Sequence, residues 1–152
     1  MATKYDTLLR QIEAKQHSFG GSMQPPCPTT AIQELREASR KHLSYSIPDE
    51  YAEFLSQTNG LVWNGLVIYA SDRTPIVGYS DRFIEGFIDG NLGYRDFEPM
   101  KDYLVFADDG TSLYVYDIGE AAHRIILRVG LSIMESFTSF EILIAKALEE
   151  HL

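Results

Sequence analysis

Few residues of this chain have the types and spacing that enzyme chemistry requires. The sequence has no G-x-x-x-x-G-K phosphate loop, no G-x-S-x-G nucleophile motif and no H-E-x-x-H metal motif. Its histidines are scattered along the chain: His17, His42, His123 and His151. His123 lies at the start of a predicted strand, where a structural role is more common than that of a general base. We therefore expect no enzymatic activity and no catalytic residue.

Thiol and metal chemistry are not expected either. Cys27 is the only cysteine, so it cannot form an intrachain disulfide, and no basic residue adjoins it to activate the thiol. Asp89, Asn91 and Gly93 resemble the start of a calcium-binding loop. However, the glycine comes too early, and Met100 stands where the loop requires a bidentate glutamate. The sequence predicts no cofactor and no metal site.

Acidic residues are concentrated in one part of the sequence. The chain of 152 residues has a net charge of −9, and residues 81–120 contribute −7, because they contain ten acids and three bases. A surface of this sign does not favour nucleic acid, whose phosphates require positive charge. It attracts a basic protein partner and accelerates their encounter. The alternative is that the acids only keep the protein soluble.

Aromatic residues supply further candidates for partner contacts. The chain has nine tyrosines and one tryptophan, and interface hot spots are enriched in Trp, Tyr and Arg. Together with neighbouring acids, the predicted partner-binding residues are Trp63, Tyr69, Tyr94, Asp108, Asp109, Tyr114, Tyr116 and Asp117. Two alternatives stay open: half or more of the aromatic residues belong to the core, and Asp108-Asp109 only forms a turn. Whether Trp63 is exposed is open as well.

The helices that must position these residues are indicated by apolar spacing. Helices are expected over residues 3–16, from Thr30 onward, from 47–50 onward and from Thr138 to the end. Thr30 with Gln33 and Thr138 with Glu141 have the spacing of capping boxes. The stretch 18–28 contains two glycines and three prolines, so we interpret it as a loop that fixes the first helix against the rest.

Alternating apolar residues indicate strands in the middle of the chain, over 67–69, 103–106, 113–116 and 125–129. Asp108-Asp109-Gly110 predicts a hairpin turn. Asn59-Gly60 is interpreted as a Schellman stop of the third helix, and Asn64-Gly65 as a separate turn that starts a strand. Residues 71–100 give no clear pattern. Helices, then a meandering antiparallel sheet, then a closing helix indicate an α+β fold.

The length indicates a single domain over residues 1–152. Residues 1–28 are expected to form an N-terminal helix and loop extension, and residues 29–150 the core. The first residues lack the pattern of a signal peptide, and no apolar run approaches the roughly 18 residues of a membrane span. We therefore expect a soluble, cytoplasmic protein, monomeric or weakly dimeric, that does not bind membranes.

Three segments together resemble the SUKH superfamily of Smi/Knr-like domains. They are I-P-D-E-Y-A-E-F-L-S-Q-T-N-G (47–60), L-V-F-A-D-D-G-T-S-L-Y-V-Y-D (104–117) and S-F-E-I-L-I-A-K-A-L (139–148). The resemblance covers roughly residues 29–150 and places residues 1–28 in an extension that only some branches have. It implies a small α+β domain that binds other proteins and is not known for catalysis.

Two functions follow from this resemblance. Many bacterial members are immunity proteins that neutralise toxin domains, often nucleases, delivered between competing cells, and the acidic block would suit a basic toxin surface. Fungal relatives regulate cell-wall synthesis and signalling through protein contacts, so an intracellular regulatory module is the alternative. A small enzyme that depends on His123 or on an acidic pair ranks last.

Overall fold

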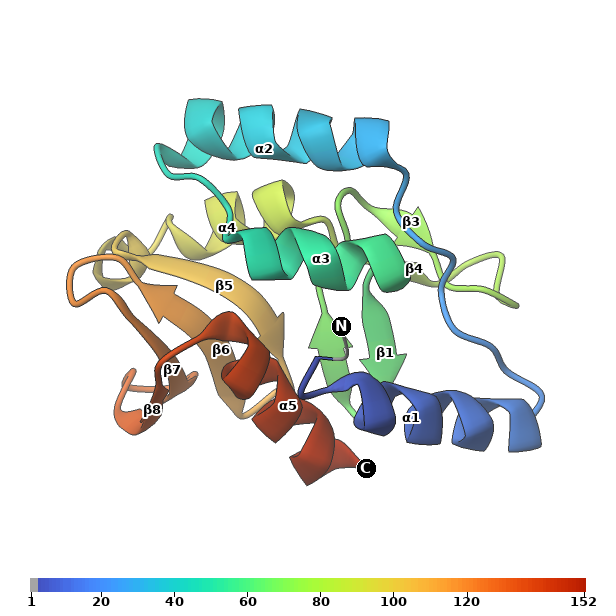
Figure 1. Ribbon diagram of the computed structural model, residues 1–152. Helices are drawn as coiled ribbons and strands as arrows, with labels where there is room; N and C mark the ends of the chain where they lie inside the picture. The colour runs from blue at the N-terminus through green and yellow to red at the C-terminus, as the bar shows by residue number, and fades with distance from the viewer. Residues whose placement is uncertain (1–2) are drawn as a thin grey trace.

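The computed structural model describes residues 3–152 and combines helices with an antiparallel sheet (Figure 1). Within this range the helices are α1 (Asp6–Ser18), α2 (Thr29–Leu43), α3 (Asp49–Gln57), α4 (Phe87–Tyr94), the 3-10 helix η1 (Glu98–Met100) and α5 (Phe140–His151). Helices α1 to α3 precede the main sheet and α5 follows it, which confirms the predicted α+β fold. None of these helices is both long and apolar enough to cross a bilayer.

The main sheet has the strand order β1-β2-β5-β6-β7-β8. Its strands are β1 (Leu61–Trp63), β2 (Leu66–Ile68), β5 (Tyr103–Asp108), β6 (Ser112–Asp117), β7 (Ala122–Leu127) and β8 (Ile133–Phe137). Every neighbouring pair is antiparallel, so the sheet is a meander with one interruption, between β2 and β5. That interruption holds α4, η1 and a separate ribbon of β3 (Thr74–Pro75) and β4 (Phe83–Ile84).

Aromatic rings from both helices and sheet form the centre of the core. The ring of Phe106 on β5 lies 5.1 Å from that of Tyr51 on α3 and 5.0 Å from that of Phe140 on α5. Phe87, at the start of α4, stacks on Phe106. Each of these buried rings contributes roughly 1.5–3 kcal/mol through its removal from water. Helix α2 packs on α3 and α4, which lie between it and the sheet, whereas α5 packs on β6 and β7 (Figure 1).

The leading helix is part of this core. Tyr5, just before α1, and Leu9 and Ile12 within it are buried, and the ring of Tyr5 meets Phe54 of α3 edge-on at 5.6 Å. The following loop is tied down by backbone bonds such as Cys27 N to Leu55 O at 2.8 Å. Residues 3–28 therefore contribute apolar surface to the body of the protein and do not form a separable appendage.

Three predicted helix ends are wrong by one or a few residues. Helix α2 begins at Thr29 after Pro28 and has no side-chain cap, so Thr30 does not form a capping box. The cap of α5 is Ser139, whose Oγ accepts from Ile142 N at 3.2 Å, and not Thr138. Helix α3 does not end in a Schellman motif, because Thr58 is extended. Instead, Asn59 N donates to Pro25 O at 2.9 Å, a long-range contact that a local pattern cannot reveal.

Asn64-Gly65 forms a two-residue hairpin turn and does more than start a strand. Both residues have positive φ, 45° and 86°, as the type I′ turn requires. Trp63 and Leu66, which flank the turn, pair across β1 and β2. The other predicted turn, at Asp108-Asp109-Gly110, is confirmed, with Gly110 at φ +89° between β5 and β6.

Helix α4 was not predicted because its stabilising contacts are distant in sequence. It contains two glycines, which weaken a helix, but its Asn91 is fully buried and bonds to the sheet. The Asn91 amide donates to Val105 O at 2.9 Å and accepts from Val105 N at 2.7 Å. Edge strand β8 was missed for a different reason: four of its five residues are exposed, so it has no alternating pattern.

Candidate functional site

Three of the predicted partner-binding residues meet at one end of the sheet. Tyr69 follows β2, Tyr94 ends α4 and Asp108 ends β5. The Tyr69 hydroxyl donates to Asp108 Oδ2 at 2.7 Å and lies 2.7 Å from the Tyr94 hydroxyl. Because Tyr69 donates its only hydroxyl proton to the carboxylate, Tyr94 must be the donor in the hydrogen bond between the two hydroxyls. The result is a chain of hydrogen bonds that runs from Tyr94 through Tyr69 to Asp108.

The charge at the end of this chain is compensated within the protein. Arg128 Nη1 lies 3.5 Å from Asp108 Oδ1, and its guanidinium lies over the Tyr94 ring. Burial, reinforced by the hydrogen bond that Tyr69 donates to Asp108 and by the charge of that carboxylate, raises the pKa of Tyr69. Burial also raises the pKa of Tyr94. Both phenols therefore stay neutral, and the network positions side chains without offering a base near neutral pH.

Asp109 has a structural role in the β5–β6 turn. Its carboxylate accepts from Ser112 N at 2.7 Å, from the Tyr114 hydroxyl at 2.8 Å and from His151 Nε2 at 3.1 Å. Burial acts to raise the pKa of Asp109, but these hydrogen bonds and the charge of His151 outweigh it, and the net effect is a lowered pKa. The acid thus links the turn to β6 and to the end of α5.

Asp117 on β6 and His123 on β7 are also buried, whereas Tyr116 on β6 is half-buried. Asp117 is 7% exposed and lies 3.3 Å from Arg124 Nη1. The ring of His123 lies 4.9 Å from that of Tyr116. Burial lowers the pKa of His123 to about 4, so the imidazole is neutral near pH 7. No acid pairs with His123 within residues 3–152, which fits the structural role expected from the sequence.

Trp63 is neither fully exposed nor fully buried, the two possibilities that the sequence left open. The residue is half-buried and packs against the core from β1. Its indole Nε1 is shielded from solvent and has no hydrogen-bond partner within residues 3–152. One edge of the ring therefore contributes to the core, while the rest lines a surface groove.

The structure changes which residues can form the predicted acidic surface. Tyr69, Tyr114 and Asp117 are buried and cannot touch a partner in this conformation. Asp108 and Asp109 are half-buried and have internal partners. The exposed acids of the block 81–120 are the others: Asp81, Glu85, Asp89, Asp96, Glu98, Asp102 and Glu120. The three aspartates chosen from the sequence are therefore the three that the fold uses internally.

Four exposed residues between α4 and β5 are better placed for a partner: Asp96, Phe97, Glu98 and Asp102, named here the α4–η1 surface. Phe97 is 59% exposed and borders a groove of about 240 Å³ that Tyr94, Arg128 and Leu131 also line. An exposed aromatic ring among carboxylates is suited to a basic, partly apolar partner. The signal in the sequence is the D-F-E triplet at 96–98, which places an aromatic residue between two acids.

Metal chemistry has no site in the described part of the chain. Nowhere in residues 3–152 do three or more His, Cys, Asp or Glu side chains come together as metal ligands would. Asp89, Asn91 and Gly93, which resembled a calcium loop, lie within α4.

Comparison with known families decides the identity of the fold. The family model described as SMI1-KNR4 cell-wall matches residues 33–140, which is more than half of the chain. The chain belongs to the SUKH superfamily. A comparison with curated proteins found no match.

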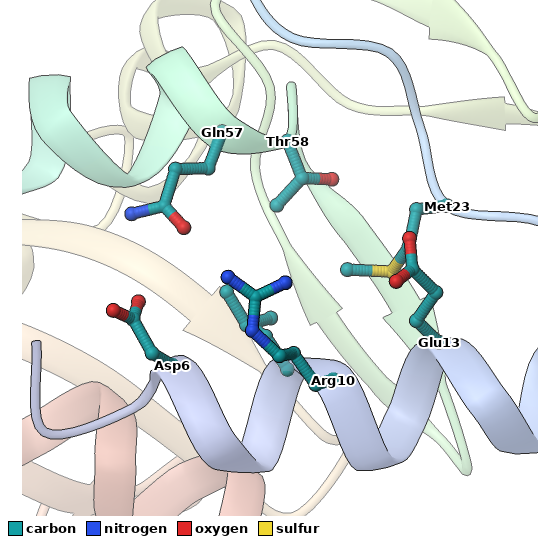
Figure 2. Close-up of a pocket in the computed structure, with 7 residues that line it drawn as sticks. Asp6, Arg10, Glu13, Met23, Gln57 and Thr58 are labelled. Carbon is teal, nitrogen blue, oxygen red and sulfur yellow. The ribbon is translucent and has the colours of Figure 1, made fainter. Parts of the chain in front are cut away.

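The SUKH match extends from α2 to the first residue of α5, so α1 lies outside it. Figure 2 shows how α1 is joined to the matched part. Asp6, Arg10 and Glu13 of α1 face Gln57 and Thr58, at the end of α3, across a cleft of about 100 Å³. Ligand sites usually occupy about 300–1,000 Å³, so this cleft is a seam between α1 and the SUKH core and is too small for a cofactor.

Proposed function

We propose that this SUKH protein acts by binding another protein, without catalysis, and that it is a cytoplasmic immunity protein that occludes a basic toxin domain. The observation that carries the proposal is the α4–η1 surface, a short segment on which the acids Asp96, Glu98 and Asp102 and the ring of Phe97 are all exposed. Membership in a superfamily of protein-binding domains supports a binding role over an enzymatic one.

The charges of this surface suit a basic partner better than nucleic acid. Lys101 is the one base between Asp96 and Asp102 and is paired with Glu98 at 2.7 Å. An exposed pair of this kind is worth little and opens readily, so Glu98 remains available to a lysine or arginine of the partner. Phe97 would supply apolar contact area at the centre, with the acids as a charged rim.

Neutralisation of the α4–η1 surface tests the proposal directly. The chain is co-expressed with a candidate toxin encoded next to it, and complex formation is measured by size exclusion and by association kinetics. Asp96→Asn, Glu98→Gln and Asp102→Asn together should slow association about tenfold or more at low salt. Phe97→Ala should instead accelerate dissociation, because it removes contact area without charge.

The matched control changes the same charge elsewhere. Glu53, Glu135 and Glu149 are exposed and lie outside residues 81–120, and their replacement by glutamine should leave association within about twofold. If both triple variants slow association equally, only net charge matters and the α4–η1 surface is not the binding site. If cells expressing the toxin die equally with and without this chain, the immunity role is excluded.

The matched family's description favours a second candidate, because it refers to the cell wall. In that case the chain would be an intracellular regulatory module that assembles with a resident protein. A pull-down that returns one stable cellular partner, lost in the Asp96, Glu98 and Asp102 variant, with no toxin gene nearby, would select this function.

A further inference from the structure

A second groove lies on the side of the molecule formed by β1. It runs along the free edge of β1, between the loop after α1 and the loop that joins β3 to β4. Its volume is about 290 Å³, and Trp63, Val62, Phe19 and Tyr79 line it. Phe19 and Tyr79 are 83% and 51% exposed. The groove therefore presents aromatic surface to solvent beside an unpaired strand.

The backbone of Val62 points into this groove. In a two-residue hairpin, the residues that flank the turn exchange both of their backbone hydrogen bonds, and the next pair along the strands exchanges none. Trp63 and Leu66 flank the turn, so Val62 and Val67 form the pair without mutual bonds. The N–H and C=O of Val62 are consequently directed away from β2, toward the free edge. No backbone bond from Val62 to a residue outside the sheet occurs within residues 3–152.

The charge of the groove is opposite to that of the protein as a whole. The guanidinium of Arg82 stacks over the Tyr79 ring at 4.9 Å and takes part in no ion pair within residues 3–152. Stacking fixes the plane of the guanidinium while its N–H groups stay free for a carboxylate. Two further polar atoms that are shielded from solvent, Trp63 Nε1 and Gln16 Oε1, lack partners in the same groove.

We propose that this groove binds an extended segment of a partner protein that adds as a strand along β1 and carries a carboxylate next to an apolar side chain. The backbone of the segment would bond to Val62, its apolar side chain would pack on Trp63 and Phe19, and its carboxylate would pair with Arg82. A symmetric pairing of β1 with β1 of a second copy lacks the complement, because Leu61-Val62-Trp63 has no acid to meet Arg82. The proposal does not depend on the immunity function.

A selection from displayed random peptides of eight residues tests the proposal with the whole chain as bait. The selected peptides should contain Asp or Glu beside an aliphatic or aromatic residue. Each should shift the indole N–H resonance of Trp63, which is the only tryptophan and thus a unique probe of the groove. Selected peptides that are basic, or that leave this resonance unmoved, would overturn the proposal, as would the absence of any selected peptide.

Two variants separate the backbone contact from the charge contact. Val62→Pro removes the outward N–H, and proline is tolerated at such an edge position because that N–H is not part of the ladder. It should weaken peptide binding about tenfold. Arg82→Gln should lower the affinity for acidic peptides about tenfold. It should not change the affinity for the same peptides when Asn or Gln replaces the acid. If Val62→Pro does not fold, Arg82→Gln still decides, because equal loss for acidic and neutral peptides contradicts the proposal.

The matched control lies on the other surface. The variant with Asp96→Asn, Glu98→Gln and Asp102→Asn should bind the selected peptides as the unmodified chain does. If this variant loses the peptides and Arg82→Gln does not, the peptides bind the α4–η1 surface and the β1 groove is not their site.

Discussion

At the residue scale, the acids of this protein divide into two groups that look alike in the sequence. Asp108, Asp109 and Asp117 each accept hydrogen bonds or pair with an arginine inside the fold. Their removal would leave buried donors unsatisfied, which usually costs about 1–3 kcal/mol. Asp96 and Asp102 are exposed and have no ion-pair partner within residues 3–152. Only the second group is available for a partner without loss of stability.

His123 gives the protein a predictable response to acid. In the unfolded chain its imidazole protonates near pH 6.5, whereas in the folded protein burial lowers the pKa to about 4. Between these values the unfolded state binds more protons, so the free energy of unfolding falls as the pH is lowered from 6.5 to 4. The expected loss is up to roughly 3 kcal/mol, measured by urea denaturation at several pH values.

The His123 prediction has a matched control. His123→Leu should flatten the dependence between pH 6.5 and 4, whereas replacement of the exposed His42 by leucine should leave it as it is. If the unmodified protein shows no loss of stability over this range, the imidazole is not excluded from water as the structure indicates. The lowered pKa of Asp109 adds a further loss, but only at lower pH, where that carboxylate becomes protonated.

At the element scale, the ends of the helices are set by partners from other parts of the chain. Helix α5 begins at Phe140, whose ring is fully buried against Phe106, and Ser139 then falls at the capping position. Thr138 and Ser139 have nearly the same capping propensity, so sequence alone does not separate them. Burial of the Phe140 ring separates the two candidate caps, because it sets the first residue of the helix.

Exchange of the two candidate caps tests this assignment. Ser139→Ala removes the acceptor of the Ile142 N–H and should lower the free energy of unfolding by about 1 kcal/mol. Thr138→Ala should change it by less than about 0.5 kcal/mol, because Thr138 is exposed and precedes the cap. Equal effects in denaturant titrations would contradict the assignment of Ser139 as the cap.

At the scale of the whole molecule, the C-terminal residues are hydrogen-bonded to α1 and to two hairpin turns of the sheet. Lys15 Nζ of α1 donates to Leu152 O at 2.7 Å, and Asn64 Nδ2 of the first hairpin donates to His151 O at 2.8 Å. His151 in turn contacts Asp109 of the β5–β6 turn. Helix α1, α5 and the β1–β2 and β5–β6 turns are thus linked at one end of the sheet (Figure 1).

We therefore expect a single cooperative unfolding transition that includes α1. Trp63 fluorescence and far-UV circular dichroism should report the same midpoint in urea. Ile12→Ala, within α1, should lower the stability by about 2–5 kcal/mol in both signals, whereas Thr7→Ala, exposed on the same helix, should not. Loss of helical signal before the change in fluorescence would mean that α1 unfolds independently.

The sequence by itself determined the fold class, the order of the long helices and central strands, and the superfamily. These rest on local features: apolar periodicity for the long helices and central strands, a glycine that accepts positive φ at Asp108-Asp109-Gly110, and three short segments in a fixed order. Such features depend on neighbours a few residues apart, so they can be read without knowing which distant segments meet.

Only the tertiary structure decided which side chains are available for binding. Tyr69 and Asp108 are 39 residues apart in sequence, yet they share a hydrogen bond. Asn91 gains its partners only when α4 meets β5. An aspartate in the sequence looks the same whether it will face solvent or a buried tyrosine, because that outcome depends on long-range packing. The acidic block thus divides into three internal acids and seven exposed ones, of which three lie on the α4–η1 surface. The single tryptophan forms one wall of the groove along β1.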